Sequence, residues 1–201
     1  MSDVSQPKAK MLSRREFLEF LVSAGTVVGF GGLIRVASPS QGFVRPPGAL
    51  PDDKFLASCV KCQKCIDICP TLAIQSVTIQ EDWMHAGTPF MNFLRGFCNL
   101  CMKCGPVCPT GALQLIPKES VKMGIAEVRP DTCIAYTWMG CTKCYHYCPN
   151  KAIELDAMDR PIVKAEICNG CGVCENVCAS IALRSSSLRS SKQKGIFVKP
   201  L

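Results

Sequence analysis

Cysteine is the residue type whose number and spacing carry chemistry in this chain. All sixteen cysteines of the 201 residues fall into four groups of four. The groups, numbered one to four, are Cys59, Cys62, Cys65 and Cys69; Cys98, Cys101, Cys104 and Cys108; Cys133, Cys141, Cys144 and Cys148; and Cys168, Cys171, Cys174 and Cys178. Proline follows the last cysteine of groups one to three. Two-residue gaps, then a three-residue gap and proline, form the bacterial run that binds [4Fe–4S] clusters.

The ligand count fits this chemistry without remainder. A cubane cluster needs four thiolates, three from one run and the fourth from the last cysteine of its partner run. We therefore predict four [4Fe–4S] clusters with all sixteen cysteines as ligands. Zinc knuckles use only two cysteines of each run. A disulfide framework would need eight bridges among cysteines that are poorly spaced to pair.

A second repeat follows each group. Alanine lies four residues after the last cysteine and Ile or Leu comes next: Ala73-Ile74, Ala112-Leu113, Ala152-Ile153 and Ala182-Leu183. A small residue lets the backbone pass close to a cluster, and the aliphatic side chain excludes water from it. The same residues could instead close a small hydrophobic turn.

Short elements position the groups. Residues 124–128 and 161–167 are rich in β-branched residues and predict strands, whereas 51–57 predict a helix opened by acidic residues. Residues 89–97 show no clear period. We predict an α+β fold of tandem bacterial-ferredoxin-like two-cluster units, 55–118 and 119–184, with short strands, short helices and much loop. Pairing of groups one with two and three with four is favoured, and a nested pairing is the alternative.

Group three departs from the common spacing. Seven residues, 134–140, separate its first two cysteines and include Tyr136 and Trp138. This insertion could control solvent access, dock a partner, or simply pack against the unit.

The N-terminus indicates where the chain works. Ser13-Arg14-Arg15-Glu16-Phe17-Leu18 precedes an apolar, glycine-rich run and resembles a twin-arginine export signal. That route carries folded proteins, which suits a chain loaded with clusters in the cytoplasm. Residues 1–40 are thus predicted to be a signal or an uncleaved membrane anchor, followed by an extended linker over 41–54. The predicted location is periplasmic, on or near the outer face of the cytoplasmic membrane.

Charge argues against nucleic-acid binding. The formal net charge is +7, and residues outside 1–40 contribute +5 of it. Four oxidised clusters with their thiolates bring about −8, so the basic residues largely balance cluster charge. The basic, serine-rich segment 185–201 is predicted to be a solvated tail, or a docking strip for anionic lipid headgroups or an acidic redox partner.

Residues for substrate chemistry are scarce. The chain has two histidines and neither a P-loop nor a dinucleotide-binding fingerprint. We therefore expect an electron carrier and not an enzyme with its own substrate site.

Several segments carry a family resemblance. The twin-arginine start, Arg45-Pro46-Pro47-Gly48-Ala49-Leu50, the stretch from Phe55 to Cys62, and the widened group three resemble the NapG/MauM family of periplasmic ferredoxin-type proteins. The regular group two departs from that family's pattern. The resemblance implies a membrane-bound quinol-oxidising ferredoxin-type partner and a periplasmic redox enzyme, with electrons passing between them.

Two other functions fit the same residues. The chain could be the iron–sulfur subunit of a molybdenum-type oxidoreductase complex, or a maturation factor whose clusters are structural. Membrane-surface contact through the N-terminal segment or the basic tail is a further expectation.

Overall fold

The computed structural model describes Arg15 and residues 42–137, 140–181 and 194–201. Contacts divide the chain into two units, Met1–Gln41 and Gly42–Leu201, and the second contains every cysteine. The predicted export signal (apart from Arg15), Trp138 and much of the predicted basic tail lie outside the described residues. Within the described part of the chain, none of the helices has the length and apolarity needed to cross a bilayer.

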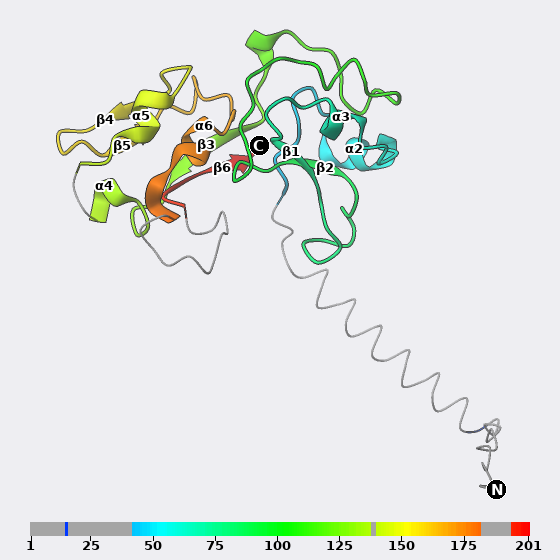
Figure 1. The fold of residues 1–201 in the computed structure, drawn as a ribbon, viewed down its shortest axis with the longest axis horizontal. Helices are drawn as coiled ribbons and strands as arrows, with labels where there is room; N and C mark the ends of the chain where they lie inside the picture. The colour runs from blue at the N-terminus through cyan, green and yellow to red at the C-terminus, as the bar shows by residue number, and fades with distance from the viewer. Residues whose placement is uncertain (1–14, 16–41, 138–139, 182–193) are drawn as a thin grey trace, which may run out of the picture. The chain divides into compact units, whose positions relative to one another are not determined.

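The strands form three antiparallel pairs (Figure 1). In the first, β1 (Ile74–Ser76) pairs with β2 (Pro89–Met91), with Ile74 opposite Met91. In the second, β4 (Ile153–Leu155) pairs with β5 (Pro161–Val163). In the third, β3 (Gly124–Val128) pairs with β6 (Ile196–Pro200).

The first two pairs show that the cysteine repeat is a structural repeat. The first half of the Gly42–Leu201 unit, residues 42–118, contains cysteine groups one and two, and the second half, residues 119–201, contains groups three and four. In each half, one strand of the pair follows the first cysteine group and the other strand precedes the second group. Twelve residues, 77–88, join β1 to β2, whereas five residues, 156–160, join β4 to β5. The repeated aliphatic residues Ile74 and Ile153 begin β1 and β4, whereas Leu113 forms an isolated bridge with Ala49, and all six described members of the repeat are buried. Their apolar side chains form the centre of each half.

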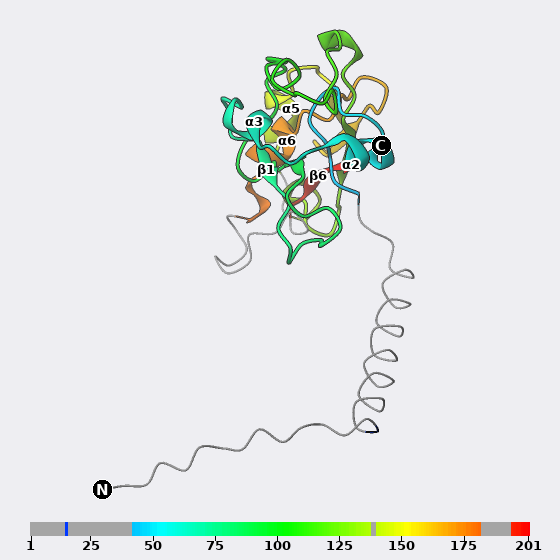
Figure 2. The same cartoon turned by 90° about the vertical axis from the view of Figure 1, so that its right-hand side faces the viewer.

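The helices are short and lie at the cysteine groups. They are α2 (Asp52–Ser58), α3 (Lys64–Asp67), α4 (Ile134–Thr137), α5 (Lys143–Tyr147) and α6 (Val173–Val177). The 3₁₀ turns are η1 (Lys118–Ser120) and η2 (Ala179–Ile181). Helix α6 lies beside β6, as Figures 1 and 2 both show. The predicted α+β class, with short elements and much loop, is confirmed.

Residues 42–50 pack against the first half of the unit. Met91 N–H donates to the Val44 carbonyl, and Leu50 N–H donates to the Ala112 carbonyl. Arg45 is buried, and its guanidinium bonds Asp52, Thr88 and the Pro89 carbonyl at 2.8–2.9 Å. The stretch predicted as an extended linker thus differs from that expectation: residues 44–47 are buried, Gly48 has φ +80° in a turn, and residues 52–54 belong to α2.

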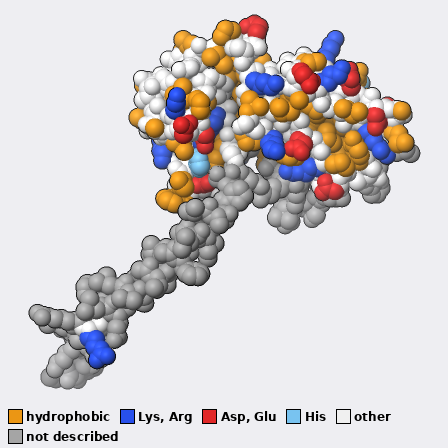
Figure 3. Space-filling model, turned by 180° about the vertical axis from the view of Figure 1, so that it is seen from behind, with side chains coloured by type: hydrophobic (Ala, Val, Ile, Leu, Met, Phe, Trp, Pro, Cys, Tyr) orange, Lys and Arg blue, Asp and Glu red, His pale blue; other side chains and the backbone are white. Residues whose placement is uncertain are grey.

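The chain end differs from the expected solvated tail. Residues 196–200 form a full strand, because Ile196 and Val198 point inward from β6 and fill the space over β3. Lys194 is also buried. Over the face seen in Figure 3, basic and acidic side chains are interspersed among hydrophobic ones.

Candidate iron–sulfur sites

Cysteines of groups one and two cross between two sites in the first half. The thiolates of Cys59, Cys62 and Cys108 all lie near enough to Cys65 to raise its pKa, which burial raises to about 11. The thiolates of Cys101 and Cys69 act likewise on Cys104. We define site A as Cys59, Cys62, Cys65 and Cys108. We define site B as Cys98, Cys101, Cys104 and Cys69.

The second half repeats this crossing. Burial raises the pKa of Cys144 to about 12, with further contributions from the thiolates of Cys133, Cys141 and Cys178. Cys171 lies near Cys148 and Cys168. We define site C as Cys133, Cys141, Cys144 and Cys178. We define site D as Cys168, Cys171, Cys174 and Cys148.

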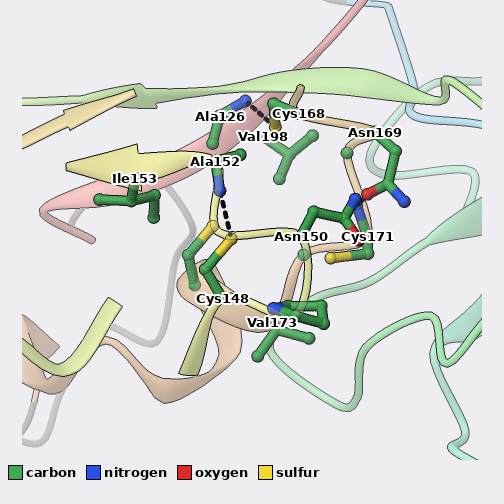
Figure 4. Close-up of a pocket in the computed structure, with 14 residues that line it drawn as sticks. Ala126, Cys148, Asn150, Ala152, Ile153, Cys168, Asn169, Cys171, Val173 and Val198 are labelled. Atoms are coloured by element: carbon green, nitrogen blue, oxygen red, sulfur yellow. Dashed lines mark hydrogen bonds between the residues drawn. The ribbon is translucent and has the colours of Figure 1, made fainter. Parts of the chain in front are cut away.

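Two cavities support the same grouping. One is lined by all four cysteines of site D together with Ala126, Ile153 and Val198. Figure 4 shows Cys148, Cys168 and Cys171 around it. The other cavity is lined by all four cysteines of site B together with Ile74 and Met91. The last cysteine of one group therefore joins the first three of its partner, as the favoured pairing requires, and the nested pairing is not observed.

Left-handed backbone shapes the loops that would wrap three corners of a cluster. Lys61 and Gln63 in group one, Leu100 and Met102 in group two, and the glycines at 170 and 172 in group four all have positive φ. Non-glycine residues pay about 1–2 kcal/mol for that conformation. The alternation turns successive N–H groups toward one side of the loop, which favours bound negative charge.

Side-chain amides add to the same loops. The Asn99 and Asn169 carbonyl oxygens each accept a bond from the N–H of the second cysteine of their group, Cys101 or Cys171, at 3.2 Å. The cysteine spacing alone did not predict a role for these asparagines. Their place directly after the first cysteine of groups two and four was the available signal.

The repeated alanine and aliphatic residues donate to the last cysteine. Ala152 N–H lies 3.3 Å from Cys148 Sγ, and Leu113 N–H lies 3.4 Å from Cys108 Sγ. Burial alone would raise the pKa of Cys69, but the Thr71 hydroxyl and nearby backbone N–H groups lower it. The alanines are 0–1% exposed, and the N–H to Sγ distances show that the backbone passes close to these sulfurs. The repeated residues therefore both close a small hydrophobic turn and surround the cluster ligands.

The four sites form a row with the order A, B, D, C. Cys65 of site A neighbours Cys104 of site B, and Cys174 of site D neighbours Cys144 of site C. Between the halves, Cys98 N–H donates to the Cys171 carbonyl at 2.8 Å. Asn176 and Gly172 both contact Phe93 at this junction. One ligand loop of each half therefore touches the other directly.

The insertion in group three packs in part against its own half. Residues 134–137 form α4, and the Arg160 guanidinium lies 5.1 Å from the centre of the Tyr136 ring. The contact with Arg160 gives Tyr136 a packing role.

His146, one of the two histidines, is exposed and its ring contacts the ring of Tyr145.

The donor sets fit [4Fe–4S] clusters. Each site combines four sulfurs, apolar walls and backbone N–H groups, the surroundings that hold and tune such clusters. Among the described residues, no three His, Cys, Asp or Glu side chains converge on a position for a single metal ion. Ligands of a cubane stand farther apart than that, because each binds its own iron.

Comparison with known proteins gives the same chemistry. Residues 58–112 match a family model described as a 4Fe–4S dicluster domain. A methylamine utilization ferredoxin-type protein, MauM of Methylorubrum extorquens, is 37% identical over 85% of this chain and 86% of its own length. The ferredoxin-type protein NapG of Escherichia coli is 33% identical over 82% of this chain and 80% of its length. The ferredoxin-type protein NapF of the same organism is 27% identical over 73% of this chain and 87% of its length.

Proposed function

This chain belongs to the family of MauM and NapG ferredoxin-type proteins, and on that premise we propose that it relays electrons through four [4Fe–4S] clusters. All sixteen cysteines are assigned as ligands, four to each of sites A, B, C and D. The observation that carries the proposal is the unbroken order A, B, D, C, joined across the halves by the Cys98–Cys171 hydrogen bond. A carrier needs such a row, whereas isolated structural clusters do not.

The chain's own residues set the conditions for transfer. When bound, a [4Fe–4S] cluster accepts and releases electrons at a potential set by its surroundings. Ala73, Ala112 and Ala152 let backbone N–H groups approach the sulfurs, and the neighbouring Ile and Leu side chains exclude water. Three of the four cysteines of site D are buried, whereas Cys62 of site A is exposed. Electrons therefore exchange with a partner most readily at site A, one end of the row, and pass through the more buried site D within it.

Iron analysis and redox titration test the relay. Anaerobically purified protein should contain roughly sixteen iron atoms per chain, and an EPR-monitored titration should show four reducible clusters. Clusters that stay inert over the range between quinol and periplasmic acceptors would support the maturation-factor alternative and end the relay proposal. A stable complex with a molybdenum enzyme on purification would instead favour the subunit alternative.

Substitution tests the crossed assignment. Cys62→Ser and Cys108→Ser should remove the same cluster signal, because both residues belong to site A. Cys69→Ser should instead match Cys101→Ser, since both belong to site B. Loss of the same cluster in Cys62→Ser and Cys69→Ser would contradict the assignment.

The partners follow from the family. We propose that electrons pass between a membrane-bound quinol-oxidising ferredoxin-type protein and a periplasmic redox enzyme, after export of the folded chain by the twin-arginine route. Replacing Arg14 and Arg15 together by lysine should keep the loaded protein in the cytoplasmic fraction. Unchanged periplasmic recovery of that variant would refute the export route and leave the relay untouched.

A further inference from the structure

The last described segment of the chain is seated on site C. Thr132 Oγ1 donates to the Lys194 carbonyl at 3.2 Å, and Arg129 N–H donates to the Gly195 carbonyl at 2.8 Å. A Cβ added at Gly195 would lie 2.6 Å from the Cys133 Cα. Residues 194 and 195 therefore pack directly on the first cysteine of site C, in space that only glycine leaves open.

This segment fixes a hydroxyl on the fourth cysteine of site C. Gly195 N–H donates to Ser180 Oγ at 2.8 Å, and Ser180 Oγ lies 3.1 Å from Cys178 Sγ. Because an N–H group can only donate, Ser180 accepts from Gly195. Its own hydrogen is thereby left for the Cys178 sulfur.

The matching hydroxyls at sites B and A are placed less closely. Thr71 lies 3.5 Å from Cys69 Sγ, and Thr110 lies 3.7 Å from Cys108 Sγ. Among the described residues, no backbone N–H donates to either threonine hydroxyl. The Ser180 bond is thus the shortest of the three and is oriented by a second bond.

The same segment places a buried positive charge near Cys178. Lys194 is 5% exposed, and its ammonium donates to the carbonyls of Glu175 and Asn176 at the end of α6. Burial lowers the pKa of Lys194, and the Cys178 thiolate opposes that effect more strongly than Glu175 does. Two backbone carbonyls accept from this side chain, which favours its charged form. The buried Glu175 carboxylate offsets part of the charge and accepts from Val198 N–H at 2.8 Å.

Reduction adds negative charge to a cluster. Hydrogen-bond donors to the sulfurs and nearby positive charge stabilise the reduced form and raise its potential, most strongly where water is excluded. We propose that Ser180 and Lys194, both positioned by the C-terminal segment, make the cluster of site C the most oxidising of the four. Electrons would then collect at site C and leave the protein there. This inference rests on the proposed relay.

The test is an EPR-monitored redox titration of the full, anaerobically loaded chain. Cys141→Ser identifies the site C signal by removing it. We expect Ser180→Ala and Lys194→Met each to lower the potential of the highest-potential cluster only. The expected change is roughly tenfold in the reduced-to-oxidised ratio at fixed potential, which is about 59 mV for one electron. Ser180→Thr and Lys194→Arg should restore most of it.

Matched controls separate tuning from general effects. Thr110→Val removes the equivalent hydroxyl at site A, and Lys199→Met removes an exposed charge from β6; neither should move the site C potential. If Lys194→Met fails to load four clusters, the smaller Ser180→Ala change decides the question.

Two results would overturn the inference while leaving the relay intact. The first is a highest-potential signal that survives in Cys141→Ser. The second is a set of four potentials unchanged in Ser180→Ala. If no cluster of the unmodified protein is reducible, the proposed relay itself fails.

Discussion

Replacing Gly172 by alanine should weaken the junction between the two halves of the unit. Gly172 has φ +77° and is the residue before α6, and a Cβ there would lie 1.9 Å from Cδ1 of the Phe93 ring. Phe93 is buried and comes from the other half. The ring has little room to move because Phe93 is only 4% exposed, and its backbone is held by the Asn176 side chain, which donates to the Phe93 carbonyl at 3.0 Å.

The magnitude follows from three contributions. The left-handed backbone costs alanine about 1–2 kcal/mol, and overpacking against Phe93 costs about 1–3 kcal/mol. Reduced freedom of the unfolded chain returns about 0.4–1 kcal/mol. The net expectation is a loss of about 2–4 kcal/mol. Gly111→Ala is the matched control, because Gly111 has φ +68° and nothing within 4 Å of the added Cβ; it should lose only about 1 kcal/mol.

The assay is the rate at which the loaded protein loses cluster absorbance in denaturant, because unfolding with cluster loss is irreversible and stability is then a rate. If the whole loss appears in the unfolding rate, Gly172→Ala should lose its clusters roughly thirty to several hundred times faster than the unmodified protein, at about 1.4 kcal/mol per tenfold. Gly111→Ala should change the rate by less than about tenfold. In the double variant Phe93→Ala with Gly172→Ala, the decrease in stability should be smaller than the sum of the decreases in the two single variants, because the added Cβ no longer meets a ring. Equal rates for the two glycine variants, or strict additivity in the double variant, would refute the reasoning.

Three further predictions concern protons and buried polar groups. Burial raises the pKa of Cys98 and Cys144 to about 12 and of Cys104 to about 11 without clusters, so these thiols are protonated at neutral pH. Cluster assembly should therefore release protons and become more favourable as pH rises, measured as proton release in weak buffer; pH-independent assembly would contradict this. Arg45→Met should cost about 2–3 kcal/mol, because Thr88 and the Pro89 carbonyl lose a charged donor, and it should speed cluster loss more than Lys54→Met at an exposed site. Hydrogen bonds from the N–H groups of Arg160 and Met158 lower the pKa of Asp156, so Asp156 stabilises the β4–β5 turn above its unfolded pKa and loses that effect as pH falls. Asp156→Ala should accordingly differ most from the unmodified protein at neutral pH, in the same cluster-loss assay.

Local sequence patterns predicted the parts of the fold that depend on local chemistry. Residues 124–128 were predicted as a strand and coincide with β3, and the predicted helix at 51–57 overlaps α2. The cysteine spacing also predicted that the last cysteine of each group joins a partner group, and it left the choice between the observed pairing and a nested one open. These features succeed because each depends on a few adjacent residues and on the geometry of one cofactor.

Local sequence patterns did not predict which strands pair when the two strands lie far apart in the chain. The partner of β3 is β6, which follows a basic, serine-rich stretch whose composition hides a five-residue strand. β5 ends at Val163 instead of 167, because Lys164 to Ile167 turn toward Cys168. Lys194 and Ser180 were missed for a related reason: their importance comes from contact with site C, which only the folded chain creates.

The pairing of β3 with β6 also determines the order in which the two halves can fold during translation. Residues 42–116 contain everything in sites A and B, so the first half can close while the rest is still being made. The second half cannot close until Ile196–Pro200, the last of the described strands, has left the ribosome and paired with Gly124–Val128. Chains grow from the N-terminus at about 5–20 residues per second. A prematurely ended chain would therefore display a finished first half beside an open second one, a difference that proteases and the cell's quality control can detect.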